Sequence, residues 1–137
     1  MKYSIFTVCL IFIIGCEPER SIVPNTHDNR VPEIINVTAW VDSISPTRKV
    51  VRIRWAKDTL KQYTDQLKNW EVFRSLNDTA QFTSRGTTFI PAWDDASVHR
   101  TDRDVTVFYK IFPNGELTTK GQFIGKPSDV IKLTVRK

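Results

Sequence analysis

The sequence predicts an all-β protein whose strands form an antiparallel sandwich. Apolar and polar residues alternate with a period of two along several short segments, as expected of strands with one buried face. Turn-forming residues separate these segments, and helical spacing is confined to one stretch. Many short strands joined by turns favour two packed antiparallel sheets.

The alternation assigns a core side to each expected strand in order. After an opening segment at 32–39, Val51, Ile53 and Trp55 form the apolar phase of the next strand. The expected inward residues that follow are Trp70, Val72, Val107, Tyr109 and Ile111, and a last alternating strand covers 130–136. The turn signals between strands are Pro46, Asn77-Asp78, Arg85-Gly86, Pro113-Asn114-Gly115 and Lys126-Pro127-Ser128.

One segment breaks the two-residue period. Within residues 57–68, Leu60, Tyr63 and Leu67 have the i, i+3, i+7 spacing of a helix with one apolar face. We expect a short helix inserted between two strands, covering one end of the sandwich.

These strands resemble a fibronectin type III domain over residues 32–137. The resemblance rests on the first strand at 32–39, the Trp-bearing second strand at 51–55 and the third at 70–75. It continues in the sixth strand at 105–111 with the following Asn114-Gly115, and in the entry to the last strand at 128–131. Two departures leave another immunoglobulin-like sandwich open: Val107 stands where that family often has Tyr, and the link 93–104 is long and charged.

The N-terminal segment predicts a signal peptide at residues 1–15. A single basic residue, Lys2, precedes an apolar stretch at 5–14, which is too short to span a bilayer of about 30 Å. The run 13–16, ending in Gly15-Cys16, resembles the bacterial lipobox, which implies cleavage after Gly15 and lipid on Cys16. The alternative is an ordinary secretory signal that ends at a Cys.

The remaining cysteine usage agrees with a lipoprotein. Cys9 would leave with the signal and Cys16 would carry lipid, so the mature domain has no disulfide and no cysteine ligand or nucleophile. Residues 16–31, with two prolines and many polar residues, are expected to be a flexible tether. Glu17, rather than Asp, after Cys16 favours the outer membrane, with the periplasmic and surface sides both open.

A second resemblance concerns the source. The triplets Asp42-Ser43-Ile44, Asp58-Thr59-Leu60 and Asp78-Thr79-Ala80 resemble the O-glycosylation sites of exported Bacteroidota proteins. The chain has 20 basic and 15 acidic residues interleaved along its length, which disfavours a nucleic acid partner.

Few residues suggest chemistry. His27 and His99 lie in no metal-binding or catalytic spacing. The only candidates for a metal site, and weak ones, are Asp94, Asp95, Asp102 and Asp104. Arg100 and Arg103 among them favour a loop with local salt bridges instead. We therefore expect neither a cofactor nor an enzymatic activity.

Aromatic residues on the outward phase suggest an interface. If Trp70, Val72, Tyr109 and Ile111 face inward, the opposite phase of the two strands carries Phe73, Phe108 and Phe112, flanked by Glu71 and Lys110. Such a patch either contacts a partner or is covered by the 57–68 insert.

These features favour a lipid-anchored binding or adhesion module for a protein or glycan. The alternative is a structural or accessory subunit of an outer-membrane secretion or nutrient-uptake complex.

Overall fold

The protein is all-β in the part of the chain that the structure describes. The computed structural model describes residues 31–59, 67–118 and 121–137. Its strands are β1 (Ile34–Ser45), β2 (Arg48–Lys57), β3 (Leu67–Leu76), β4 (Thr83–Thr88), β5 (Ala92–Asp95), β6 (Val105–Thr118), β7 (Gly121–Ile124) and β8 (Ile131–Val135).

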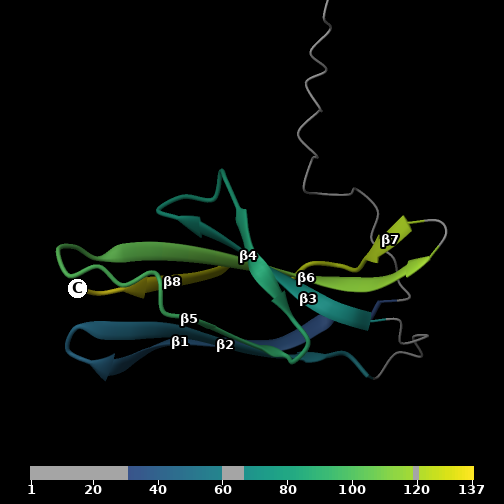
Figure 1. The fold of residues 1–137 in the computed structure, drawn as a ribbon, viewed down its shortest axis with the longest axis horizontal. Coiled ribbons are helices and arrows are strands. Elements are labelled where there is room, and N and C mark those ends of the chain that lie inside the picture. Colours follow the sequence, from purple (N-terminus) through teal and green to yellow (C-terminus); the bar gives the residue numbers. More distant parts are fainter. Residues whose placement is uncertain (1–30, 60–66, 119–120) are drawn as a thin grey trace, which may run out of the picture.

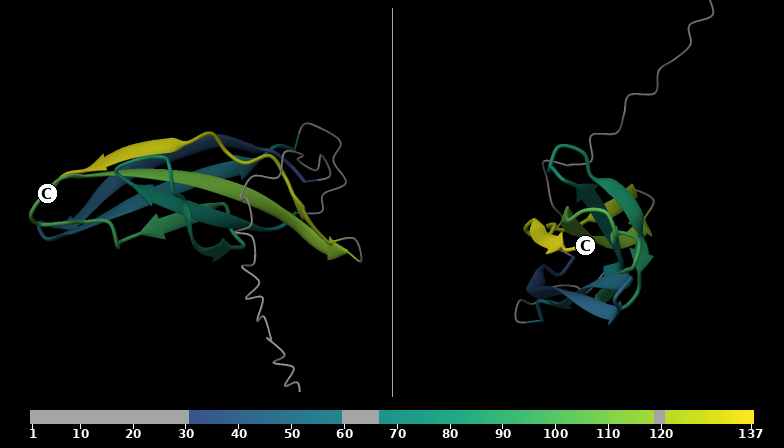
Figure 2. Two further views of the ribbon diagram at one scale, coloured as in Figure 1. Left: turned by 90° about the horizontal axis from the view of Figure 1, so that it is seen from above. Right: turned by 90° about the vertical axis from the view of Figure 1, so that its left-hand side faces the viewer.

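The strands form two antiparallel sheets. One has the order β1-β2-β5, and the other has the order β4-β3-β6-β7 with β8 also paired to β6. The sheets lie face to face, as Figures 1 and 2 show, which confirms the predicted sandwich. β4 pairs with β3 and not with β5. In constant immunoglobulin domains, by contrast, the fourth strand belongs to the same sheet as the first, second and fifth strands.

The core lies between the inner faces of the two sheets. The residues that alternation assigned to it are all buried, namely Val51, Ile53, Trp55, Trp70, Val72, Val107, Tyr109 and Ile111. Trp55 of β2 and Trp70 of β3 meet edge to face, with ring centroids 5.8 Å apart. This contact joins the two sheets directly, and the register that alternation predicted is therefore confirmed.

A buried polar network also joins the sheets. Asp95 of β5 accepts hydrogen bonds from the Tyr109 hydroxyl at 2.9 Å and from Arg74 Nη1 at 2.7 Å. The Asp95 and Arg74 side chains are 6% and 11% exposed. Ser97 adds bonds to Asp95 from its hydroxyl and its backbone N–H.

The surroundings of Asp95 and Tyr109 shift both pKa values. Burial raises the pKa of Asp95, but hydrogen bonds from Ser97, Arg74 and Tyr109 outweigh it, so the pKa lies below the ordinary 3.8. For Tyr109, burial, then the charge of Asp95 and the bond to it, raise the pKa well above 10. The network therefore holds an ionised carboxylate against a neutral phenol.

Two predicted turns are strand residues instead. Gly86 lies inside β4 at a register shift, where Val72 pairs with Gly86 and Phe73 pairs with Ser84. Its φ of 134° suits glycine, and a Cβ would lie 3.4 Å from the Trp93 ring. Arg85-Gly86 thus marks a β-bulge, a feature that uses glycine for the same conformational reason as a turn.

The second wrong turn is Pro113-Asn114-Gly115, which continues β6. Pro113 pairs with Trp70, and its carbonyl accepts a bond from Gly125 N–H at 2.8 Å. Asn114 is buried and donates to Asn69 Oδ1 at 3.0 Å. The turns at Pro46 and at Asn77-Asp78 are confirmed, and Asn77 takes a positive φ of 67°.

Several expectations fall at the edges of the described residues. Lys57 ends β2 and Leu67 begins β3, so both ends of the expected 57–68 helix are strand, and residues 60–66 lie outside the description. The signal peptide, Gly15, Cys16 and most of the tether also lie outside it. Val31, placed at the tether's end, is buried. No helix among the described residues could cross a membrane.

Candidate functional site

An exposed tryptophan stands on the outer face of the β1-β2-β5 sheet. Trp40 alternates with Ala39 and Val41, which pack against the core, so its ring lies on the opposite side of β1. Its side of the sheet is polar, because Thr38 and Asp42 share its phase. Trp40 remains 42% exposed.

Pairing places charged residues in a row with this ring. Trp40 pairs with Arg52, and Arg52 pairs with Asp94, so the three residues lie across all three strands of the sheet. Asp42 lies two positions beyond Trp40 on β1, and Arg54 lies two positions beyond Arg52 on β2.

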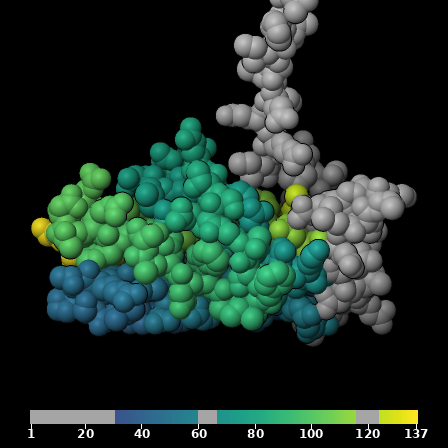
Figure 3. Space-filling view, viewed as in Figure 1, coloured from purple at the N-terminus to yellow at the C-terminus, as the bar shows by residue number. Residues whose placement is uncertain are grey.

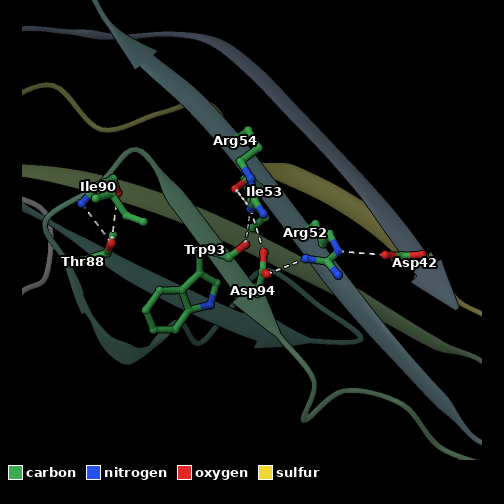
Figure 4. Close-up of polar contacts among 8 residues, drawn as sticks. All are labelled: Asp42, Arg52, Ile53, Arg54, Thr88, Ile90, Trp93 and Asp94. Atoms are coloured by element: carbon green, nitrogen blue, oxygen red, sulfur yellow. Dashed lines mark hydrogen bonds and ion pairs between the residues drawn. The ribbon is translucent and has the colours of Figure 1, made fainter. Parts of the chain in front are cut away.

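The charged side chains form a continuous ladder, which Figure 4 shows. Arg52 Nε donates to Asp42 Oδ2 at 2.9 Å, and Arg52 Nη1 donates to Asp94 Oδ2 at 2.7 Å. Arg54 Nη1 donates to the other oxygen, Asp94 Oδ1, at 2.7 Å. We call Trp40, Asp42, Arg52, Arg54 and Asp94 the Trp40 face.

Backbone contacts fix the end of the ladder beside the ring. Arg54 Nη1 also bonds the carbonyl oxygens of Ile53 at 2.8 Å and Trp93 at 3.2 Å. The Arg54 guanidinium carbon lies 5.6 Å from the centroid of Trp40, within range of a cation–π interaction. The Trp40 face is therefore held in shape before any ligand arrives.

Stability alone does not account for this arrangement. The Arg52, Arg54, Asp42 and Asp94 side chains are between 29% and 43% exposed, and ion pairs so open to water contribute about 0–1 kcal/mol each. Among the described residues, Arg54 bonds only through Nη1 and Asp42 only through Oδ2. Donor N–H groups and an acceptor oxygen thus remain free for a ligand.

A second exposed feature is the connection between β4 and β5. Phe89 is 72% exposed and Ile90 is 64% exposed. Thr88 fixes their backbone, because its hydroxyl donates to the Ile90 carbonyl at 3.0 Å, as Figure 4 also draws. In the space-filling view the teal-to-green surface of the chain that follows β3 borders the blue surface of β1 and β2 (Figure 3).

Of the two forms that we expected for the phenylalanine patch, exposed or covered, exposure does not hold at Phe112. Phe112 is buried, 4% exposed, and packs edge to face on Phe73 with centroids 5.0 Å apart. Lys110 Nζ lies 5.7 Å from the Phe112 ring, and Glu71 accepts a bond from Ser84 at 2.6 Å. Alternation predicted the face of the sheet on which these side chains lie, but it did not predict whether other residues bury them.

Phe108 does not share that ring contact. Lys132 Nζ of β8 lies 5.8 Å from its ring, and Phe108 is only partly exposed. Whether the insert covers Phe73 and Phe112 lies outside the described residues.

The four candidate aspartates do not gather into a metal site. Asp94 pairs with Arg52 and Arg54, while Asp95 points into the sandwich. Asp104 accepts a bond from the Lys137 backbone N–H at 2.9 Å, and Asp102 is exposed. No group of three potential ligands that could hold a metal ion occurs in the described ranges. Asp94 and Asp95 pair instead with arginines of β2 and β3, and not with the nearby Arg100 and Arg103 as the loop interpretation expected.

Sequence reasoning missed Trp40, although a signal was present. A tryptophan in the polar phase of a strand, between Thr38 and Asp42, places a large aromatic ring on the outer face of the sheet. The ladder itself was not visible, because it depends on β5, which was expected to be a link. Comparisons with protein-family models, with curated proteins and with solved structures find no match.

Proposed function

We propose that this chain is a lipid-anchored, non-enzymatic binding module of the bacterial outer membrane that holds its partner on the Trp40 face. The observation that carries this proposal is the exposure of Trp40 beside the fixed ladder of Arg52, Arg54 and two aspartates. Tryptophan and arginine are the residues that most often supply binding energy at interfaces.

The sequence supports the anchoring part of the proposal. The resemblance of residues 13–16 to a lipobox implies a lipid on Cys16. The polar residues that follow would form a tether that holds the domain away from the membrane. The fibronectin type III resemblance fits a module that binds rather than reacts, although a fold alone fixes no function.

Photo-crosslinking in intact cells tests the binding surface. A benzophenone amino acid at Thr38, which is exposed and shares the phase of Trp40, is expected to give a discrete covalent adduct on the full-length protein. Adding Trp40→Ala should abolish the adduct. The matched control places the same group at Thr134, an exposed residue of β8, where no adduct is expected. Equal adducts at Thr38 with and without Trp40 would contradict the proposal.

A second candidate function is an accessory subunit of an outer-membrane complex. The exposed pair Phe89 and Ile90 favours it, because adjoining apolar side chains held at a connection suit a protein contact. The same crosslinker at Phe89 separates the two functions. An adduct there with one envelope protein, unaffected by Trp40→Ala, would support the subunit role, and its absence would remove it.

A further inference from the structure

The charges of the Trp40 face cancel one another. Arg52 and Arg54 share the carboxylate of Asp94 between them, and Arg52 also bonds Asp42. Two positive and two negative side chains therefore sum to zero, each within hydrogen-bond distance of an opposite charge. This balance restricts the kind of ligand that the face can hold.

A charged ligand fits the ladder poorly. An anionic group placed on Arg52 would lie beside the carboxylates of Asp42 and Asp94, and a cationic group placed on either carboxylate would lie beside a guanidinium. In both cases like charges would meet, or an existing ion pair would have to break. Phosphate chains, acidic polysaccharides and basic peptides are thereby disfavoured.

A neutral ligand rich in hydroxyl groups fits the same positions without this conflict. A hydroxyl donates one hydrogen bond and accepts others, so it can bond a guanidinium N–H and a carboxylate oxygen at once. The unused N–H groups of Arg54 and the second oxygen of Asp42 offer one partner of each kind. Bonds to charged partners are stronger than bonds between neutral groups.

Trp40 supplies the apolar half of the contact. Its ring is 42% exposed, and a large flat aromatic surface with a polar N–H suits a ligand that is apolar on one side and polar at its edges. Sugar rings have this character, since their C–H groups form an apolar face and their hydroxyls point outward. The row of residues crosses three strands, and neighbouring strands lie about 4.8 Å apart, so the face is wider than a single sugar ring.

We propose that the Trp40 face binds a neutral oligosaccharide or polysaccharide, with one sugar ring against Trp40 and the hydroxyls of adjacent units on the Arg–Asp ladder. This inference rests on the proposed function and names the ligand class for the same site.

Titration of the full mature lipoprotein, purified in detergent, with defined sugars tests the inference. The probes are neutral hexasaccharides of glucose, mannose and xylose, and hexagalacturonate serves as an anionic probe of equal length. NMR follows the indole N–H of Trp40, while Trp55 and Trp70, both buried, serve as internal controls. At least one neutral probe should shift the Trp40 signal and leave the buried pair unmoved.

Variants make the test specific. Trp40→Ala should weaken binding of that neutral probe at least tenfold by calorimetry, whereas Phe89→Ala, which removes an even more exposed ring, should leave it unchanged. Asp94→Asn removes the carboxylate that Arg52 and Arg54 share, so it should raise affinity for hexagalacturonate at least fivefold. Thermal melting confirms that each variant is folded.

The outcomes are decisive in either direction. Failure of every neutral probe to shift Trp40, or tighter binding of hexagalacturonate than of the neutral probes by the unaltered protein, would overturn the inference. If the Thr38 adduct in cells still depends on Trp40 in that event, the binding module stands and only the ligand class is wrong. If that adduct does not depend on Trp40, the proposed function itself fails.

Discussion

Replacing Asp95 by Ala should destabilise the sandwich more than its single hydrogen bonds suggest. The Asp95 carboxylate bridges the sheets, because it lies on β5 and bonds Arg74 of β3 and Tyr109 of β6. In Asp95→Ala, the buried guanidinium of Arg74 loses its carboxylate and keeps its hydrogen bond to the Ser97 hydroxyl. The Tyr109 hydroxyl loses its acceptor.

The expected loss follows from the burial of both partners. Removing one member of a buried ion pair costs about 3–5 kcal/mol, and an unsatisfied buried hydroxyl costs about 1–3 kcal/mol. The two terms overlap, because both measure the same missing carboxylate, so we expect a loss of about 3–5 kcal/mol. Domains of this kind have about 5–15 kcal/mol of total stability, so the variant should be close to unfolding.

Urea unfolding measures this loss, and a double variant isolates its cause. Arg74→Met removes the charge that Asp95→Ala leaves unpaired, so the double variant should be more stable than the two single losses predict, by at least about 1 kcal/mol. A loss below about 1 kcal/mol in Asp95→Ala, or strictly additive losses, would refute the account of the network.

Three further predictions follow from the same structure. Because the pKa of Asp95 is lowered on folding, its contribution is complete above about pH 4 and lost as pH falls through the folded value; urea midpoints should fall less steeply with acid in Asp95→Asn. Trp55→Ala should cost about 3–5 kcal/mol, because Trp55 is buried against Trp70, and an unchanged melting curve would contradict its place in the core. Cys16→Ala should block lipidation and leave unprocessed precursor; fatty-acid label retained on this variant would exclude the lipoprotein interpretation.

The sequence predicted the strands with strong alternation and missed those without it. β2, β3 and β6 have bulky apolar residues in one phase, and the same phase is buried. β4 is Thr-Ser-Arg-Gly-Thr-Thr, polar on both faces, and β5 has four residues, so neither gives a periodic signal. Gly86 and Pro113 were assigned to turns because glycine and proline are common there. The assignment was wrong because both residues also occur at bulges and strand irregularities.

The candidate site was harder to predict, because its contacts join distant strands. Alternation alone turns Trp40 and Arg52 outward, yet only the register of β2 on β5 brings Asp94 beside both arginines. For Phe112, alternation predicted the outer face of the strand, but it could not show that the side chain is buried there. Direction is a local property of a strand, whereas exposure depends on what else packs there.

Hydroxyl-radical footprinting of the full-length protein in isolated envelopes tests the central claim most directly. Trp40 and Phe89 are both exposed aromatic side chains that such radicals oxidise, and they belong to different elements, β1 and the connection between β4 and β5. If a partner occupies the Trp40 face, oxidation of Trp40 should fall several-fold relative to the purified protein, while Phe89 is oxidised at the same rate. Equal oxidation of Trp40 in both preparations would contradict the claim.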